Sequence, residues 1–369
     1  MSSKVWFVSA YSDSSASNLP TKLRRLWKAT GFAETLSPGQ LIAIKTHFGE
    51  EGNTTYLRPE FAALYADAVK ETGAKPFLTD SQTLYRGQRS NAVDHFNLAT
   101  RHGFSYATLG CPLIFGDGLL GRDSVDVEIG QKHFQTIRIG SAYYYMDGAV
   151  VLSHVKGHIL AGMGAALKNI SMGMASRAQK QALHSEQRPT VNREYCVACG
   201  ACIQWCPEDA ISLVEGKASI DHELCIGCGE CVSVCRFDAV NINFQTEVKP
   251  MLERMAEFCY GYHQLKGDRT LYINFLLDIT PDCDCAGWSD TPMVPDIGVL
   301  ASFDPVAIDR ASADLVNEQQ GLAETRLHSN LEPGGDKFEG LTGSPWYYLL
   351  EYAEQLGVGS REYELVKLG

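Results

Sequence analysis

Eight cysteines near the middle of the chain recur in two copies of one spacing, and this repeat constrains the fold more than any other feature. The copies read CVACGACIQWCPEDAI (residues 196–211) and CIGCGECVSVCRFDAV (residues 225–240), 29 positions apart. Both follow C-x2-C-x2-C-x3-C, the spacing of cysteines that ligate a [4Fe–4S] cluster. Glycines at 200, 227 and 229 would let the backbone turn close to the sulfides. Zinc sites and disulfides are the alternatives, but zinc sites usually pair their cysteines.

The segment Tyr195–Asn243 resembles the two-cluster bacterial ferredoxins. In that pattern the fourth cysteine of each motif ligates the cluster of the other motif. The resemblance implies one cluster on Cys196, Cys199, Cys202 and Cys235, and a second on Cys225, Cys228, Cys231 and Cys206. Pro207 follows Cys206 as in these ferredoxins, whereas Arg236 stands where the second proline is expected. That cation either raises the cluster potential, contacts a partner or is an ordinary solvated arginine.

The sequence on both sides of the repeat alternates apolar strands with amphipathic helices. We expect strands over 4–11, 41–48, 75–81, 135–140, 148–155, 270–279 and 297–302, and helices over 19–31, 59–73, 246–265 and 305–321. Apolar runs such as Leu41–Ile44 and Ala149–Leu152 are typical of strands buried on both faces. This alternation predicts an α/β fold, with a mostly parallel sheet flanked by helices. A small α+β ferredoxin-type domain (188–245) is expected to interrupt it, between 1–187 and 246–369.

The composition limits the classes of partner. Hydrophobic residues make up 45% of the chain, which is ample for a packed core, and the formal net charge is -12. An acidic chain without a basic face is not expected to bind nucleic acid. No stretch has the length and apolarity of a membrane span, and the apolar N-terminal run is too short for a signal peptide. We therefore expect a cytoplasmic location, where twelve cysteines indicate metal binding rather than disulfides.

Three expected strands end in residues that carry chemistry. Lys45 and His47 follow the first, His154, Lys156 and His158 follow the second, and Cys283 and Cys285 follow the third. Ligands of parallel α/β sheets bind at the carboxyl ends of the strands. If the three strands are neighbours, these seven residues share one crevice and form a candidate catalytic site.

Each of these residues also has a structural interpretation. Isolated histidines and lysines often serve only local structure, and Asp304 before Pro305 is expected to be a helix N-cap. Cys283 and Cys285 are too close for an unstrained disulfide, and acidic neighbours surround them. A cation would relieve that charge, so a metal or redox site is one hypothesis, with His47, His154 or His158 as co-ligands. A substrate-contacting thiol and a structural role remain the alternatives.

The flanking segments resemble the family known as domain of unknown function 362. The resemblance rests on IKTHFGEEGNTTYLRP (44–59), SHVKGHILAGMGAALKNISMG (153–173) and CDCAGWSDTPMVPDIGVLASFDPVAIDRAS (283–312). It covers nearly the whole chain, and many members of the family carry a ferredoxin insertion. It implies architecture and positions for a site, and it names no reaction.

Together these features predict an iron–sulfur oxidoreductase or electron-transfer protein of anaerobic metabolism. Two [4Fe–4S] clusters would pass single electrons to the site in the α/β domain, with a redox protein or a small molecule as partner. One alternative is a non-catalytic electron-transfer and docking subunit. Another is a protein that handles metals or clusters, with Cys283 and Cys285 passing metal on.

Overall fold

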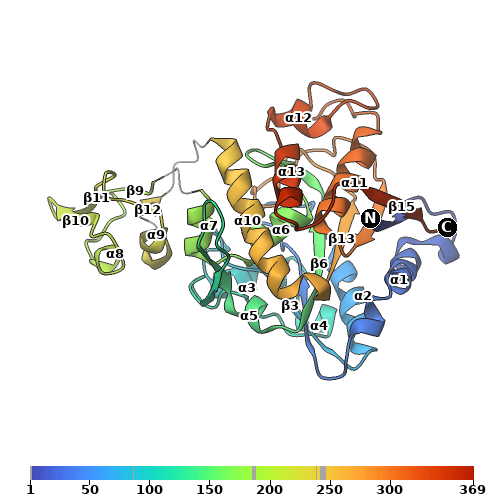
Figure 1. Cartoon of the computed structure of the whole chain (residues 1–369), viewed down its shortest axis with the longest axis horizontal. Coiled ribbons are helices and arrows are strands. Elements are labelled where there is room, and N and C mark those ends of the chain that lie inside the picture. The colour runs from blue at the N-terminus through green and yellow to red at the C-terminus, as the bar shows by residue number, and fades with distance from the viewer. Residues whose placement is uncertain (1, 86, 185–187, 238, 242–246) are drawn as a thin grey trace.

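The structure, a computed structural model, describes residues 2–85, 87–184, 188–237, 239–241 and 247–369. Most of the chain packs around one sheet, while the elements between residues 190 and 241 lie together at one end of the long axis (Figure 1). The predicted domain boundaries at 187 and 245 lie outside the described residues. No helix of the described ranges has both the length and the apolarity to cross a membrane.

The central sheet has seven strands in the order β15-β1-β14-β13-β6-β2-β3. Their bounds are β1 Ser3–Ser9, β2 Leu41–Lys45, β3 Lys75–Thr79, β6 Gly148–His154, β13 Thr270–Leu276, β14 Gly298–Ser302 and β15 Tyr363–Lys367. β13, β6, β2 and β3 are parallel neighbours, and β1 is parallel to β15. Only β14 of this sheet runs against its neighbours, β1 and β13. The expectation of a mostly parallel sheet is therefore confirmed.

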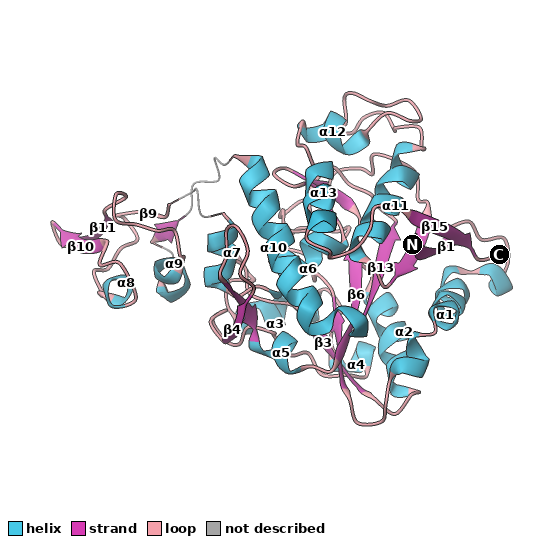
Figure 2. Ribbon diagram, viewed as in Figure 1, coloured by secondary structure: helices cyan, strands magenta, loops and turns pink. Residues whose placement is uncertain are grey.

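Helices cover both faces of this sheet (Figure 2). The larger helices are α1 Leu19–Thr30, α2 Pro59–Lys70, α6 Ala166–Met174, α10 Val248–Lys266, α11 Pro305–Asn317 and α13 Tyr347–Gln355. Side chains of β6 alternate between two apolar clusters, with Ala149 and Val151 in one and Val150 and Leu152 in the other. The apolar run of β6 thus reflects burial on both faces, as its sequence indicates.

Two predicted helix ends are confirmed by their caps. α1 ends at Gly31, which has φ 68°, a left-handed conformation that favours glycine. Asp304 caps α11, because its side chain accepts hydrogen bonds from the amides of Val306 and Ala307. Pro305 occupies the first turn, where no backbone N–H is needed.

The predicted strand over 135–140 does not join the central sheet. β5 (Thr136–Gly140) pairs with β4 (Ser124–Glu128) in a separate antiparallel ribbon. Its alternating exposure, with Thr136 outside and Ile137 buried, suits a ribbon that packs by one face. The remaining elements of this part are η1 Ser15–Ser17, η2 Phe32–Thr35, α3 Ala92–Arg101, α4 Tyr106–Leu109, α5 Ser141–Tyr145, β7 Lys156–His158, β8 Gly162–Gly164, α7 Arg177–Leu183, η3 Gly267–Arg269 and α12 Lys337–Thr342.

The cysteine repeat lies in short elements with a small core of their own. They are β9 Thr190–Val191, α8 Ala201–Gln204, β10 Ile211–Val214, β11 Lys217–Ile220, α9 Glu230–Val234 and β12 Val240–Asn241. α8 and α9 follow Gly200 and Gly229, which both have left-handed backbone conformations. Leu84, from the loop after β3, belongs to the same apolar cluster as Cys196 and Val232. The repeat is thereby attached to the α/β part through that loop and through α9, which packs against α7.

Candidate functional site

One cavity of about 430 Å³ opens where the parallel strands end. Lys45 is the last residue of β2, and His154 is the last residue of the neighbouring strand β6. The next strand, β13, leads into the loop that carries Cys285. The cavity is lined by six of the seven predicted site residues, namely Lys45, His47, His154, Lys156, His158 and Cys285. The seventh, Cys283, has its sulfur within 4.8 Å of ligand atoms of Cys285 and His158.

Asp284, between the two cysteines, forms a buried ion-pair centre. Its carboxylate lies 2.9 Å from Nδ1 of His154 and 2.9 Å from Nζ of Lys156. Burial opposes its ionisation, but His154 and Lys156 outweigh burial and hold the pKa of Asp284 well below its usual value. Nε2 of His154 lies 3.0 Å from the carbonyl oxygens of Leu277 and Asp278. Both ring nitrogens of His154 thus face acceptors, so this histidine positions the loop and has no nitrogen directed at a metal.

A second charged cluster borders the cavity around Arg89. Its guanidinium contacts Glu50 (Nε to Oε2, 3.1 Å), Nε2 of His47 (2.8 Å) and the hydroxyl of Tyr85. Nδ1 of His47 accepts a hydrogen bond from the Gly49 amide at 3.0 Å. Burial and the charge of Arg89 hold the pKa of His47 well below its usual value, so the ring is neutral at neutral pH.

Lys45 is fully buried and has specific partners. Its Nζ lies 2.9 Å from Oδ1 of Asp80 and donates to Oδ1 of Asn169 at 2.8 Å. A Cβ atom at residue 173 would lie 2.6 Å from this Nζ, so Gly173 leaves the space that the ammonium occupies. Burial lowers the pKa of Lys45, although Asp80 opposes that effect.

Cys283 and Cys285 lie together in a turn. The Ala286 amide donates to the Cys283 carbonyl at 2.8 Å, which closes a β-turn around Asp284 and Cys285. Nζ of Lys168 lies 3.4 Å from the sulfur of Cys283. The hydrogen bond from Cys285, together with Lys168, holds the pKa of Cys283 well below its usual value. The same hydrogen bond raises the pKa of Cys285, so one proton is shared by the two sulfurs.

His158 completes a candidate metal-ligand set. Within the described parts of the chain, His158, Cys283 and Cys285 are the one group of three or more possible ligands whose atoms all lie within 4.8 Å. Nδ1 of His158, however, accepts from the amides of Leu160 (3.3 Å) and Ala161 (3.0 Å). A metal-bound histidine instead donates its other N–H to an acceptor. His158 does not fit a metal in this arrangement, and the predicted metal depends on the two sulfurs alone.

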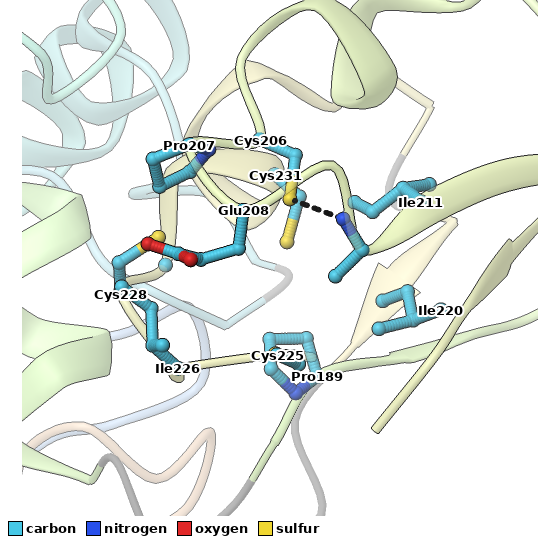
Figure 3. A pocket seen from close by; sticks show the side chains of 12 residues that line it. Pro189, Cys206, Pro207, Glu208, Ile211, Ile220, Cys225, Ile226, Cys228 and Cys231 are labelled. Atoms are coloured by element: carbon cyan, nitrogen blue, oxygen red, sulfur yellow. Dashed lines mark hydrogen bonds between the residues drawn. The ribbon is translucent and has the colours of Figure 1, made fainter. Parts of the chain in front are cut away.

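The cysteines of the repeat line two smaller cavities. One is lined by Cys225, Cys228, Cys231 and Cys206 (Figure 3), and the other by Cys196, Cys199, Cys202 and Cys235. Each set thus contains three cysteines of one motif and the last cysteine of the other. Backbone amides donate to these sulfurs at 3.3 Å, from Ala210 to Cys206, from Ala218 to Cys196 and from Ala239 to Cys235. N–H groups directed at sulfur suit thiolates that ligate a cluster.

Several residues of the large cavity were not singled out by the sequence. Arg89, Asp80, Lys180 and His184 all line it, and Asp284 pairs with residues that line it. Arg89 lies in a polar loop without periodicity, which carries no signal for burial. Lys180 lies on α7, where it donates to the carbonyl of Gln82 at 2.6 Å, a contact that only the folded chain shows. The sequence alone indicates only that Asp284 repels the neighbouring cysteines. The structure corrects this prediction, because Asp284 pairs with His154 and Lys156.

Two solved structures share a distant likeness with the chain. A lactate racemase apoprotein from Thermoanaerobacterium thermosaccharolyticum is 10% identical with a TM-score of 0.38, over 74% of this chain and 50% of that one. A Thermotoga maritima protein is 10% identical with a TM-score of 0.39, over 82% of this chain and 59% of that one. The chain thus spans between half and three fifths of the length of these two proteins. No curated protein matches it.

The model of one protein family matches the greater part of the sequence. The match extends over residues 42–314 and includes β2, β3, β6, β13, β14 and the whole cysteine repeat between them. It also covers every residue of the large cavity named above. The chain belongs to the family described as domain of unknown function (DUF362).

Proposed function

We propose that this chain is an iron–sulfur oxidoreductase. In this proposal, residues 188–245 form a bacterial-type ferredoxin domain with two [4Fe–4S] clusters, which passes single electrons to the large cavity of the α/β domain. The observation that carries the proposal is the lining of the two small cavities, each by four cysteines drawn from both motifs. The crossed sets are those that a two-cluster ferredoxin requires.

The spacing of the sulfurs favours clusters over zinc. Zinc–sulfur bonds are about 2.3 Å long, so sulfurs on one zinc lie at most about 4.6 Å apart. None of the eight cysteines, all of them described, belongs to a group of three possible ligands within 4.8 Å. The sets are therefore too wide for a single ion, whereas a cluster of several irons needs such a spread. Bound clusters would supply transfer of one electron at a time.

The position of the cavity around Cys206, Cys225, Cys228 and Cys231 favours transfer to the α/β domain. Gly229 lines this small cavity and lies so close to α7 that a Cβ there would be 2.3 Å from Gln181. On the same helix, Lys180 lines the large cavity. Leu84 contributes both to the core of the repeat and to the wall of the large cavity. α7 and the loop that carries Leu84 therefore contact both the repeat and the large cavity.

The large cavity also favours an oxidoreductase over a docking subunit. A docking subunit needs an exposed contact surface, whereas Lys45, His154 and Asp284 are at most 2% exposed. Burying these charges lowers stability unless every partner is in place. A buried thiolate beside Lys168 is a reactive group that a scaffold does not need.

Anaerobic purification with metal analysis tests the proposal. Two clusters require about eight irons and about eight sulfides per chain. We expect that stoichiometry, and signals of reduced clusters in the electron paramagnetic resonance (EPR) spectrum after dithionite treatment. Cys111→Ser, which removes a buried thiol outside the repeat, should retain all of the iron. Zinc in place of iron, or iron without EPR signals on reduction, would contradict the proposal.

A further inference from the structure

The cationic side chains of the large cavity differ in how many of their N–H groups have protein acceptors. Arg89 contacts Glu50, His47 and Tyr85, and Lys45 contacts Asp80 and Asn169. Nζ of Lys180 donates to Ser81, Gln82 and Ala175, which uses all three of its N–H groups. These three residues are therefore held by the protein itself.

Lys156 and Lys168 are engaged much less. In the described parts of the chain, Asp284 is the one ion-pair partner of Lys156, at 2.9 Å, and Cys283 is the one hydrogen-bond partner of Lys168, at 3.4 Å. Each ammonium has three N–H donors, so each retains two for another acceptor. Lys156 is only 7% exposed, and such buried donors are normally paired. An acceptor inside the cavity would complete the hydrogen bonding of both groups.

The side chains of Lys156 and Lys168 flank Gly164. A Cβ at residue 164 would lie 3.4 Å from Cε of Lys156 and 3.5 Å from Cδ of Lys168, so Gly164 lies between the two side chains. His158 borders the same space, and burial and Lys168 hold its pKa well below the usual value. It adds no charge of its own at neutral pH. Each ammonium has one anionic partner, Asp284 for Lys156 and Cys283 for Lys168, and N–H donors that remain on two neighbouring cations suit the oxygens of an oxyanion.

Apolar side chains also line the cavity. Leu152, Leu160, Met172, Met251 and Met255 line it. Methionine adapts its shape to irregular ligands. A volume of about 430 Å³ suits a small organic molecule rather than an inorganic ion alone.

We propose that the cavity binds a small molecule with an oxyanion group, a carboxylate or a phosphate, attached to an apolar portion. The oxyanion accepts hydrogen bonds from the remaining N–H groups of Lys156 and Lys168, and the apolar portion contacts the methionines. This inference names the substrate class for the oxidoreductase proposed above, and relies on that proposal only for the arrival of electrons. The binding itself needs no electron transfer.

Calorimetric titration of the anaerobically purified full-length protein tests this inference. The probes are octanoate, octyl phosphate and the uncharged octanamide, at one ionic strength. We expect at least one of the two anions to bind at least about ten-fold more tightly than octanamide, because a hydrogen bond to a charged group is worth that much. The anion that binds identifies the source as carboxylate or phosphate.

Variants of Lys168 separate the local contact from general charge. Lys168→Met should weaken binding of the anion by about ten- to hundred-fold and leave octanamide unaffected. Lys168→Arg should restore most of the affinity. Lys28→Met removes the same charge from an exposed position on α1 and should bind like the unaltered protein.

Two results would overturn the inference. One is equal affinity for the anions and octanamide, and the other is unchanged anion binding by Lys168→Met with its iron content and melting temperature retained. Iron analysis of the same samples keeps the two proposals distinct. Absence of clusters contradicts the oxidoreductase, whereas the titration alone decides the oxyanion site.

Discussion

The two groups of cysteines differ in where their surroundings originate. The eight cysteines of the repeat lie within positions 196–235, and each cavity that they line is built from neighbouring segments. Cys283 instead contacts Lys168, which is 115 positions away, and Asp284 contacts His154, 130 positions away. The ligand sets of the repeat can therefore be predicted from the spacing of its cysteines alone. The chemical environment of Cys283 and Cys285, in contrast, depends on the sheet, because the sheet brings residues that are distant in the sequence next to them.

The largest effect is expected from the crossed cysteine sets. Cys206→Ser should reduce the iron from about eight to about four per chain, because one of two clusters loses a ligand. Iodoacetamide followed by mass spectrometry should then modify Cys225, Cys228 and Cys231, which line the cavity of Cys206. Cys196, Cys199 and Cys202 should stay protected. Modification of these three instead would show that each motif holds its own cluster.

The next largest effect concerns the buried carboxylate beside the second cysteine pair. Asp284→Asn leaves Lys156 and His154 without their anion and should lower the free energy of unfolding by about 3–5 kcal/mol. Urea denaturation measures this change. Asp282→Asn, which removes an ion pair with the exposed Arg326, should cost no more than about 1 kcal/mol. Equal losses of unfolding free energy in the two variants would contradict a special role for the buried Asp284.

The same carboxylate predicts how stability depends on pH. The pKa of Asp284 is lower in the folded chain than its unfolded value of about 3.9. Its contribution is therefore complete above about pH 4 and is lost as the pH falls further. The stability difference between Asp284→Asn and the unaltered protein should shrink in that acidic range.

A smaller effect is expected from the proton shared by Cys283 and Cys285. Cys285→Ala removes the thiol that donates to the Cys283 thiolate, so the pKa of Cys283 should rise. The rate of Cys283 alkylation, followed by mass spectrometry against pH, should therefore shift to higher pH. Cys111→Ser serves as the control and should leave the profile unchanged. Coincident profiles for Cys285→Ala and the unaltered protein would show that the two sulfurs do not interact.

The smallest effect is expected where the two regions meet. The guanidinium of Arg122 lies 4.1 Å from the ring centre of Trp205, which belongs to the first cysteine motif. Arg122→Ala should weaken the attachment by about 0.5–1 kcal/mol and raise hydrogen exchange in α9 and α7. Arg193→Ala, which removes a pair with Glu215 inside the repeat, should leave exchange in α7 unchanged. The same increase in both variants would contradict a contact specific to Arg122.

Much of the α/β fold follows from local sequence patterns. Apolar runs predict β2, β6 and β13, because a strand buried on both faces must be apolar throughout. Glycine at position 31 and aspartate at 304 mark helix ends through backbone geometry and capping. The strand at 136–140 lies outside the central sheet because it pairs with β4. That pairing depends on tertiary packing, which the local sequence pattern does not predict.

The candidate site, like the fold, can be predicted from the sequence only in part. The sequence by itself determined that Lys45, His154 and Cys285 follow strands, because hydrophobic runs end where polar loops begin. Only the tertiary structure decided that these strands are neighbours and that Arg89 and Lys168 join them. It also showed that Asp284, which the sequence indicates only as a repulsive neighbour of the cysteines, pairs with the buried side chains of His154 and Lys156. Spacing along the chain encodes local ligand sets, whereas the charge around a buried group depends on residues that only folding brings together.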